Sequence, residues 1–181
     1  MGAYGDAGCI ITNDDQLSEK CKMFANHGAL VKHNHQIEGI NSRMDGLQAA
    51  ILNVKLPHII KWTEKRQLNA DLYRKYLAGI AEIELPLIRP ETKHSYHLFV
   101  IKTKHRADLL NYLRKKNIET VVHYPTALPF LSCYVNRKFT IEEFPVSYEN
   151  QSQILSLPMY PELDELSIKI ISQEIANFFK K

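Results

Sequence analysis

Two apolar patterns open the chain. Residues 8–12 form a short, apolar and β-branched run between turn signals, which predicts a buried strand. An Asn-Asp-Asp triplet at 13–15 then offers a helix N-cap, and Leu17, Cys21 and Phe24 follow on one helical face. An Asn-His-Gly triplet comes directly after this face. We therefore expect a strand followed by a helix that ends at that triplet.

The next pattern predicts a loop and a long helix. Residues 29–41 include two His and one Gly and show no periodicity, which is typical of a loop. Ser42 and Asp45 match a helix-capping pattern, and an apolar stripe at helical spacing runs through residues 44–80. Pro57 interrupts this stripe, so one helix is kinked there or two helices follow end to end.

From residue 82 the pattern of apolar and polar residues changes, and it predicts short strands that alternate with helices. Strands are expected at residues 83–85, 95–101 and 118–123, and helices at 108–116, at 145–155 and after Asp164. This alternation predicts a small α/β domain at residues 82–181. Residues 1–81 then form a separate segment that ends with the long helix.

Composition and charge exclude several classes of protein. The chain has 23 basic and 20 acidic residues, and the basic ones are scattered, unlike the dense stripe of a nucleic-acid-binding surface. No apolar run approaches the roughly 20 residues of a membrane span, and no secretory leader pattern opens the chain. The three cysteines lie far apart, as free thiols do in a reducing compartment. We expect a cytoplasmic protein that binds neither nucleic acid nor membrane.

One candidate anion site lies at the start of the long helix. Asn41 stands just before the helix expected near Ser42 and Arg43. Free N–H groups and the helix dipole favour an anion there, and Asn and Arg add donors. The same residues equally fit an ordinary capped helix with an exposed arginine, so both interpretations stay open.

Two further groups of residues offer chemistry. His27, His33 and His35 crowd into one loop, but no carboxylate or cysteine completes a metal-ligand set, so we expect hydrogen-bonded or solvated histidines and no metal. His123 and Tyr124 end a predicted strand and place an imidazole beside a phenol. This pair fits either a ligand contact or packing between strand and loop. No triad, zinc-protease, P-loop or EF-hand pattern occurs.

Seven segments, taken in order, resemble the sugar aminotransferases of the DegT/DnrJ/EryC1/StrS family. They are GAYGDAG, ITNDDQL, ANHG, IEGINSRMDGLQAAIL, VKLPHI, VVHYPTALPF and LSLPMYPEL. The likeness covers essentially the whole chain. It implies an α/β fold of the aspartate-aminotransferase type (type I, pyridoxal-phosphate-dependent), of which this chain would be the C-terminal part, with the long linking helix and the small α/β domain.

The resemblance also implies a function. Relatives of this family use pyridoxal phosphate to aminate keto sugars linked to a nucleoside diphosphate, usually with glutamate as the amino donor. In their homodimers a loop matching Glu38 to Arg43 reaches the partner subunit, where the residue matching Asn41 binds the cofactor phosphate. By the same likeness, Arg43, His123 and Tyr124 would contact substrate. Pro129 departs from a second histidine that many relatives carry.

One group that the family needs has no match in the chain. The lysine that holds the cofactor covalently lies in a segment resembling K-N-L-G-A-x-G-D-x-G, and Met1 occupies the position next to Gly2. The resemblance therefore implies no catalytic lysine here and no transamination by this polypeptide alone. Two hypotheses follow: a part of an active aminotransferase, or a truncated paralogue that pairs with or regulates a full-length relative. A third, a nucleic-acid-binding module, lacks the aromatic signature of such domains.

Overall fold

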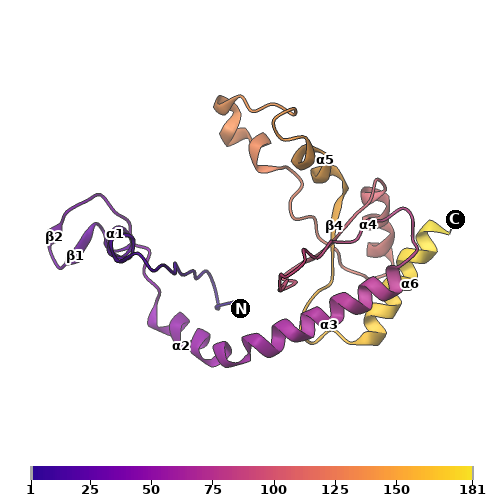
Figure 1. Cartoon of the computed structure of the whole chain (residues 1–181), viewed down its shortest axis with the longest axis horizontal. Coiled ribbons are helices and arrows are strands. Elements are labelled where there is room, and N and C mark those ends of the chain that lie inside the picture. The colour runs from indigo at the N-terminus through magenta and orange to yellow at the C-terminus, as the bar shows by residue number, and fades with distance from the viewer. Residues whose placement is uncertain (1, 181) are drawn as a thin grey trace. The chain divides into compact units, whose positions relative to one another are not determined.

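The computed structural model describes residues 2–180, and Met1, the position compared with the lysine segment, lies outside them. The chain divides into two compact units, Met1–Ile60 and Lys61–Lys181, and Figure 1 labels most of their helices and strands. This division falls before the boundary predicted near residue 81, because the long helix contributes its buried side chains to the second unit. The assignment of 1–81 and 82–181 to two domains of a whole protein stays a prediction.

The first unit begins with an exposed segment. Residues 6–12 form no strand, and Ile11 is 92% exposed. The predicted buried strand at 8–12 is therefore wrong for this chain. A strand needs a neighbouring ladder to satisfy its backbone groups, and no other described segment pairs with these residues.

Helix α1 and a short hairpin follow. Helix α1 (Asp15–Ala25) is capped as predicted: the carboxylate of Asp14 accepts from the Leu17 N–H at 3.0 Å. The segment expected to be a loop contains strands β1 (Ala29–Val31) and β2 (Asn34–His35), which pair antiparallel. The hairpin is too short to produce an apolar alternation that a sequence pattern would reveal.

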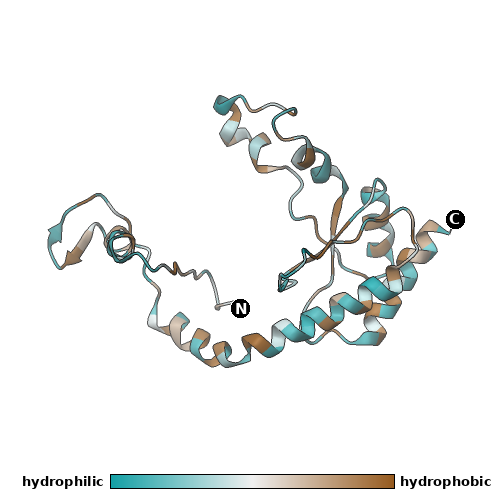
Figure 2. Ribbon diagram, in the orientation of Figure 1, coloured by the Kyte–Doolittle hydropathy of each residue, from teal (hydrophilic) through white to brown (hydrophobic). Residues whose placement is uncertain are grey.

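Helix α2 (Gly46–Lys55) starts later than the pattern at Ser42 predicts. Asp45 is its N-cap residue, without a side-chain bond, so the Ser42–Asp45 cap is wrong. Pro57 acts as expected, because the 3₁₀ turn η1 (Leu56–His58) separates α2 from α3 (Ile59–Leu77). Figure 2 shows α2 mostly white to brown along its ribbon. None of its residues is buried.

The second unit is built on a small antiparallel sheet. Strand β3 (Phe99–Lys102) pairs with β4 (Ile154–Leu157), with Phe99 opposite Leu157. Single bridges, Glu84 to Lys102 and Val121 to Ser156, add one residue pair at each edge. The predicted strands at 83–85 and 118–123 are thus reduced to isolated bridges. The helix predicted at 145–155 ends at residue 153, where β4 begins.

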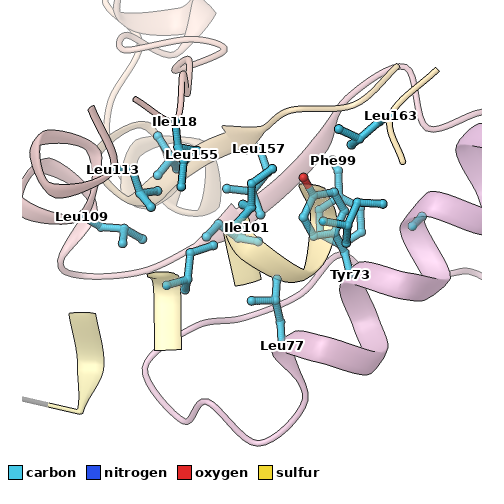
Figure 3. Close-up of a cluster of buried hydrophobic side chains, with 14 of the residues drawn as sticks. Tyr73, Leu77, Phe99, Ile101, Leu109, Leu113, Ile118, Leu155, Leu157 and Leu163 are labelled. Carbon is cyan, nitrogen blue, oxygen red and sulfur yellow. The ribbon is translucent and has the colours of Figure 1, made fainter. Parts of the chain in front are cut away.

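Helices α4 (Arg106–Lys115) and α6 (Glu165–Phe179) complete the unit around one apolar core. Asp164 caps α6 as predicted. Figure 3 shows the core side chains of α3, β3, α4 and β4 converging. Its fully buried large members include Tyr73, Leu77, Phe99, Ile101, Leu109, Leu113, Leu155, Ile168 and Ile175. Turns η2 (Leu128–Phe130) and η3 (Ser132–Arg137) and helix α5 (Pro145–Gln153) form the segment before β4.

Polar side chains of α3 hold two loops of this unit. Arg66 donates to the carbonyls of Tyr96, at 3.3 Å, and Met159, at 2.6 Å. Tyr73 donates to the carbonyl of Pro158 at 2.9 Å. Burial lowers the pKa of Arg66 and raises the pKa of Tyr73. Both side chains therefore anchor loop backbone that leads into the sheet or into α6. Among residues 2–180 no helix is long and apolar enough to cross a bilayer.

Candidate functional site

The predicted residues of the first unit form a cluster of amide and guanidinium groups. Arg43 Nε donates to Asn41 Oδ1 at 3.1 Å, and Arg43 Nη1 donates to Asn26 Oδ1 at 3.4 Å. Asn26 in turn donates from Nδ2 to the carbonyl of Ala29 at 2.8 Å. The structure therefore brings Asn41 and Arg43 together, as the sequence predicts, and adds Asn26 as a second acceptor of the Arg43 guanidinium.

The loop that carries this cluster is held by the end of α1. The N–H of Ile40 donates to the carbonyl of Phe24 at 2.8 Å, and the N–H of Ser42 donates to that of Ala25 at 2.9 Å. His27 donates back to the carbonyl of Ile40 at 2.9 Å. Carbonyls in the last turn of a helix lack partners within the helix, so the loop satisfies them and gains a fixed position.

Two glycines make this close approach possible. Gly28 has a φ of +81°, and a Cβ there would lie 1.6 Å from the carbonyl oxygen of Ile37. A Cβ on Gly39 would lie 2.3 Å from the backbone nitrogen of Gly28. Neither backbone atom can swing aside as a flexible side chain can. The glycines of the ANHG and IEGIN segments thus allow the backbones of these two segments to lie in close contact.

The cluster offers hydrogen-bond donors, but not from the helix N-terminus that the sequence predicts. Asn41 pairs with Asn26, the C-cap residue of α1, and lies five positions before α2 begins at Gly46. A helix N-terminus therefore does not supply the donors. Within residues 2–180, Asn41 Nδ2 and the second terminal nitrogen of Arg43 make no hydrogen bond, so both remain available to an acceptor. Arg43 also lines a hollow of about 1220 Å³ in this unit.

The histidines of the hairpin lie in its turn and against its backbone. His35 Nδ1 lies 2.8 Å from the carbonyl of His27, and His33 has a positive φ of 67° in the turn. In the part of the chain that the structure describes, no three His, Cys, Asp or Glu side chains gather as metal ligands do. His35 contacts the backbone of the loop, and His33 lies in its turn.

In the second unit, His123 lies against the sheet. Its Nδ1 is 2.9 Å from the hydroxyl oxygen of Ser156, a residue of β4 that is only 4% exposed. Both residues line a cavity of about 610 Å³, together with Lys116, Asn117 and Ser167 among others. That volume lies in the range of small-molecule sites.

Tyr124 lines a different cavity. The rings of His123 and Tyr124 meet edge to face at 5.5 Å, but Tyr124 borders a separate cavity of about 500 Å³ with Leu128 and Asn150. The two residues predicted as one contact pair are thus adjacent in space and turned to different cavities. Tyr124 remains 71% exposed, so its phenol is free to contact a ligand from solvent.

Sequence reasoning missed Asn26 and Ser156. Asn26 stands in the triplet taken as a simple helix stop, and no local rule shows that its amide faces residue 43. Ser156 is a polar residue between Leu155 and Leu157 in a strand. A buried serine within an apolar strand needs a hydrogen-bonding partner, and this was the available signal.

The comparisons with known proteins identify the family of the chain. The DegT/DnrJ/EryC1/StrS aminotransferase family model matches residues 1–176. The chain is similar to a pleiotropic regulatory protein of Geobacillus stearothermophilus, with 38% identity over 99% of this chain and 49% of that protein. It is also similar to dTDP-3-amino-3,4,6-trideoxy-alpha-D-glucose transaminase of Streptomyces venezuelae, with 35% identity over 91% of this chain and 43% of that protein.

A solved structure extends the likeness to the fold. S. venezuelae DesV matches with a TM-score of 0.94 and 32% identity, over 99% of this chain and 48% of that chain. This confirms the predicted fold class, the C-terminal part of an aspartate-aminotransferase-like α/β fold. The chain spans about half the length of the curated relatives it matches. The match over 176 of 181 residues shows that the chain belongs to the DegT/DnrJ/EryC1/StrS aminotransferase family.

Proposed function

We propose that this chain is the C-terminal half of a pyridoxal-phosphate-dependent aminotransferase that acts on nucleotide-linked keto sugars in amino-sugar biosynthesis, with glutamate as the amino donor. The observation that carries the proposal is the family match over residues 1–176. The relatives' printed names support the substrate class, since that of S. venezuelae is a transaminase for a dTDP-linked amino sugar.

The donor cluster of the first unit fits the phosphate of the cofactor. A phosphate needs several N–H donors, and the free amide nitrogen of Asn41 beside the Arg43 guanidinium offers them. We propose that Asn41 binds this phosphate in the site of a partner subunit of a homodimer. When bound, pyridoxal phosphate supplies the electron sink for the chemistry. The residues of this chain bind and orient.

Three residues are proposed to contact substrate. Arg43 carries the positive charge that a diphosphate requires. His123 and Tyr124 add a hydrogen-bonding imidazole and an exposed phenol at neighbouring positions. Their roles follow from the family likeness. Their suitability follows from the free polar atoms that each presents.

We further propose that the 181 residues alone do not transaminate. Transamination needs a desolvated lysine that forms a covalent bond with the cofactor and then moves a proton at the substrate carbon. The family segment that holds this lysine has no counterpart among these residues. The chain therefore shapes a pocket that other parts of the whole protein complete.

A chimera tests the proposal. The chain is joined behind the N-terminal half of the S. venezuelae transaminase, and both chimera and isolated chain are given pyridoxal phosphate, glutamate and a dTDP-linked keto sugar. We expect amino sugar from the chimera only, and borohydride should fix the cofactor to no single lysine of the isolated chain. Asn41→Ala in the chimera should weaken cofactor binding about 10- to 100-fold. Asn34→Ala, an exposed asparagine of the hairpin, is the matched control.

Two outcomes would contradict parts of this proposal. A chimera that binds the cofactor and yields no amino sugar from any nucleotide-linked keto sugar would refute the aminotransferase assignment. Amino sugar made by the isolated chain would refute its dependence on other residues.

A second function is favoured by one relative. The protein of G. stearothermophilus that is 38% identical to this chain is named a pleiotropic regulatory protein. The chain would then pair with a full-length aminotransferase and regulate it without catalysing a reaction. Stable co-purification with a full-length relative, together with a change in that enzyme's rate, would favour this alternative.

A further inference from the structure

The hydrogen bond between His123 and Ser156 ties an imidazole to the sheet. Ser156 is fixed by its own backbone, because its N–H donates to the carbonyl of Val121 at 2.8 Å and its carbonyl accepts from the Val121 N–H at 3.2 Å. The segment that ends in His123 therefore pairs with β4 at Val121, two residues before His123. The 2.9 Å contact between Ser156 Oγ and His123 Nδ1 completes this attachment at the side-chain level.

The direction of this bond follows from what the hydroxyl lacks. Ser156 is 4% exposed, and among residues 2–180 its hydroxyl has no partner other than His123. If His123 Nδ1 carried the proton, the Ser156 O–H would have no acceptor among the described residues, and a buried donor without a protein acceptor is costly. If Ser156 donates to a bare Nδ1, every buried proton is satisfied. In a neutral imidazole, which carries one ring proton, that proton must then reside on Nε2.

We propose that Ser156 is a positioning residue that holds neutral His123 with its proton on Nε2, so that the cavity beside it presents an N–H donor to an oxygen of the substrate. The proposal rests on the proposed function for the identity of the ligand. The tautomer itself is independent of that function. His123 in this state cannot accept a proton at Nε2, so it binds an oxygen and does not act there as a base.

The surroundings of His123 fit an oxygen-bearing ligand group. Lys116, Asn117 and Ser167 line the same cavity of about 610 Å³ and offer further polar groups. Lys116 Nζ forms an ion pair with Glu174 Oε2 at 3.3 Å, and the Lys116 side chain is 46% exposed. A hydroxyl, carbonyl or phosphate oxygen is an acceptor that an imidazole N–H and such groups can bind together. An ammonium group would find no acceptor at Nε2.

Nitrogen NMR of the full chain tests the tautomer without any assay of activity. Long-range ¹H–¹⁵N spectra distinguish a protonated from a bare ring nitrogen, and they are recorded at a pH of about 8.5, where an ordinary imidazole is neutral. His94 provides an internal reference, because its Nδ1 accepts from the Tyr96 N–H at 2.9 Å and must be bare. His123→Gln and His94→Gln assign the two signals. We expect His123 to show the same pattern as His94.

Variants separate positioning from mere folding. In Ser156→Ala we expect the ratio of Nε2–H to Nδ1–H tautomers of His123 to fall about fivefold, the effect of losing one ordinary hydrogen bond. Ser156→Thr keeps the hydroxyl and should restore the ratio. Ser167→Ala removes another hydroxyl of the same cavity and should change nothing at His123, and the His94 signals should stay constant throughout.

The wild-type spectrum alone can overturn the proposal, whatever the stability of the variants. A protonated Nδ1 on His123 in the wild-type chain would refute it. An unchanged ratio in folded Ser156→Ala would also refute it. Neither the wild-type spectrum nor the tautomer ratio in Ser156→Ala depends on aminotransferase activity in the chimera. Failure of this proposal and failure of the proposed function are therefore distinguishable.

Discussion

A methyl group on Gly39 should dislodge the loop that carries Asn41 and Arg43. The φ of Gly39 lies outside the left-handed region, so alanine meets no backbone strain of its own. The new Cβ would lie 2.3 Å from the nitrogen of Gly28 and 2.6 Å from the carbonyl oxygen of Phe24. Real Cβ atoms do not approach backbone so closely, so the loop must move away from α1.

The cost follows from the bonds that this movement breaks. Three backbone hydrogen bonds join the loop to the end of α1: Ile40 to Phe24, Ser42 to Ala25, and His27 to Ile40. At about 1 kcal/mol each, their loss is about 3 kcal/mol, which is on the order of a 100-fold change in the opening equilibrium. Amide exchange of the loop should speed up by that factor.

Hydrogen exchange measured on the chimera gives the assay, because there the first unit has its neighbours. The amides of Ile40 and Ser42 are followed in wild type, Gly39→Ala and Gly46→Ala. Gly46 opens α2 with nothing within 4 Å of its added Cβ, so the same substitution should leave these amides unchanged. Exchange in Gly39→Ala within twofold of wild type would refute the steric argument.

Two further predictions concern the second unit. Tyr73→Phe should lower the free energy of unfolding by about 1–2 kcal/mol in urea titrations, because the part-buried hydrogen bond from the buried Tyr73 to the carbonyl of Pro158 is lost. Tyr76→Phe, whose hydroxyl bonds at the surface, should cost much less, and equal losses would contradict this. Hydrogen bonds from Ser167 lower the pKa of Asp164, so its stabilisation is present above about pH 4 and is lost as the pH falls through that lowered pKa. The urea midpoint should therefore drop more from pH 7 to pH 3 in wild type than in Asp164→Asn, and a parallel drop would refute the linkage.

The helices could be predicted from the sequence because their signals are local. The cap at Asp14, the break at Pro57 and the cap at Asp164 each act within a few residues, and each lies where predicted. Strands depend on partners that are distant in sequence. The apolar run at 8–12 reads as a strand, yet no described segment pairs with it, and the pattern at 145–155 conceals a helix-to-strand change at Ile154.

The sequence predicts which residue types form the candidate site, but not the contacts that orient them. Asn41 and Arg43 were identified for their donors, but the supposed helix start was wrong because residues 40–42 pair with the end of α1 instead. His123 was identified for its imidazole, whereas its fixed orientation comes from Ser156, 33 residues away. The chemical groups that a site can offer follow from the identities of single residues. The contacts that aim a side chain are set by tertiary pairing.

The two units differ in how far they can stand alone, and this decides where each proposed role can be tested. Among the described residues, the fifteen-member apolar core lies entirely within the second unit, whereas the first buries only Met23 and Ala29 of its apolar side chains. Helix α2 has six apolar side chains among its ten residues and buries none of them. His123 belongs to the unit that contains this core and can be studied in this chain, while the phosphate-binding role proposed for Asn41 is tested in the chimera.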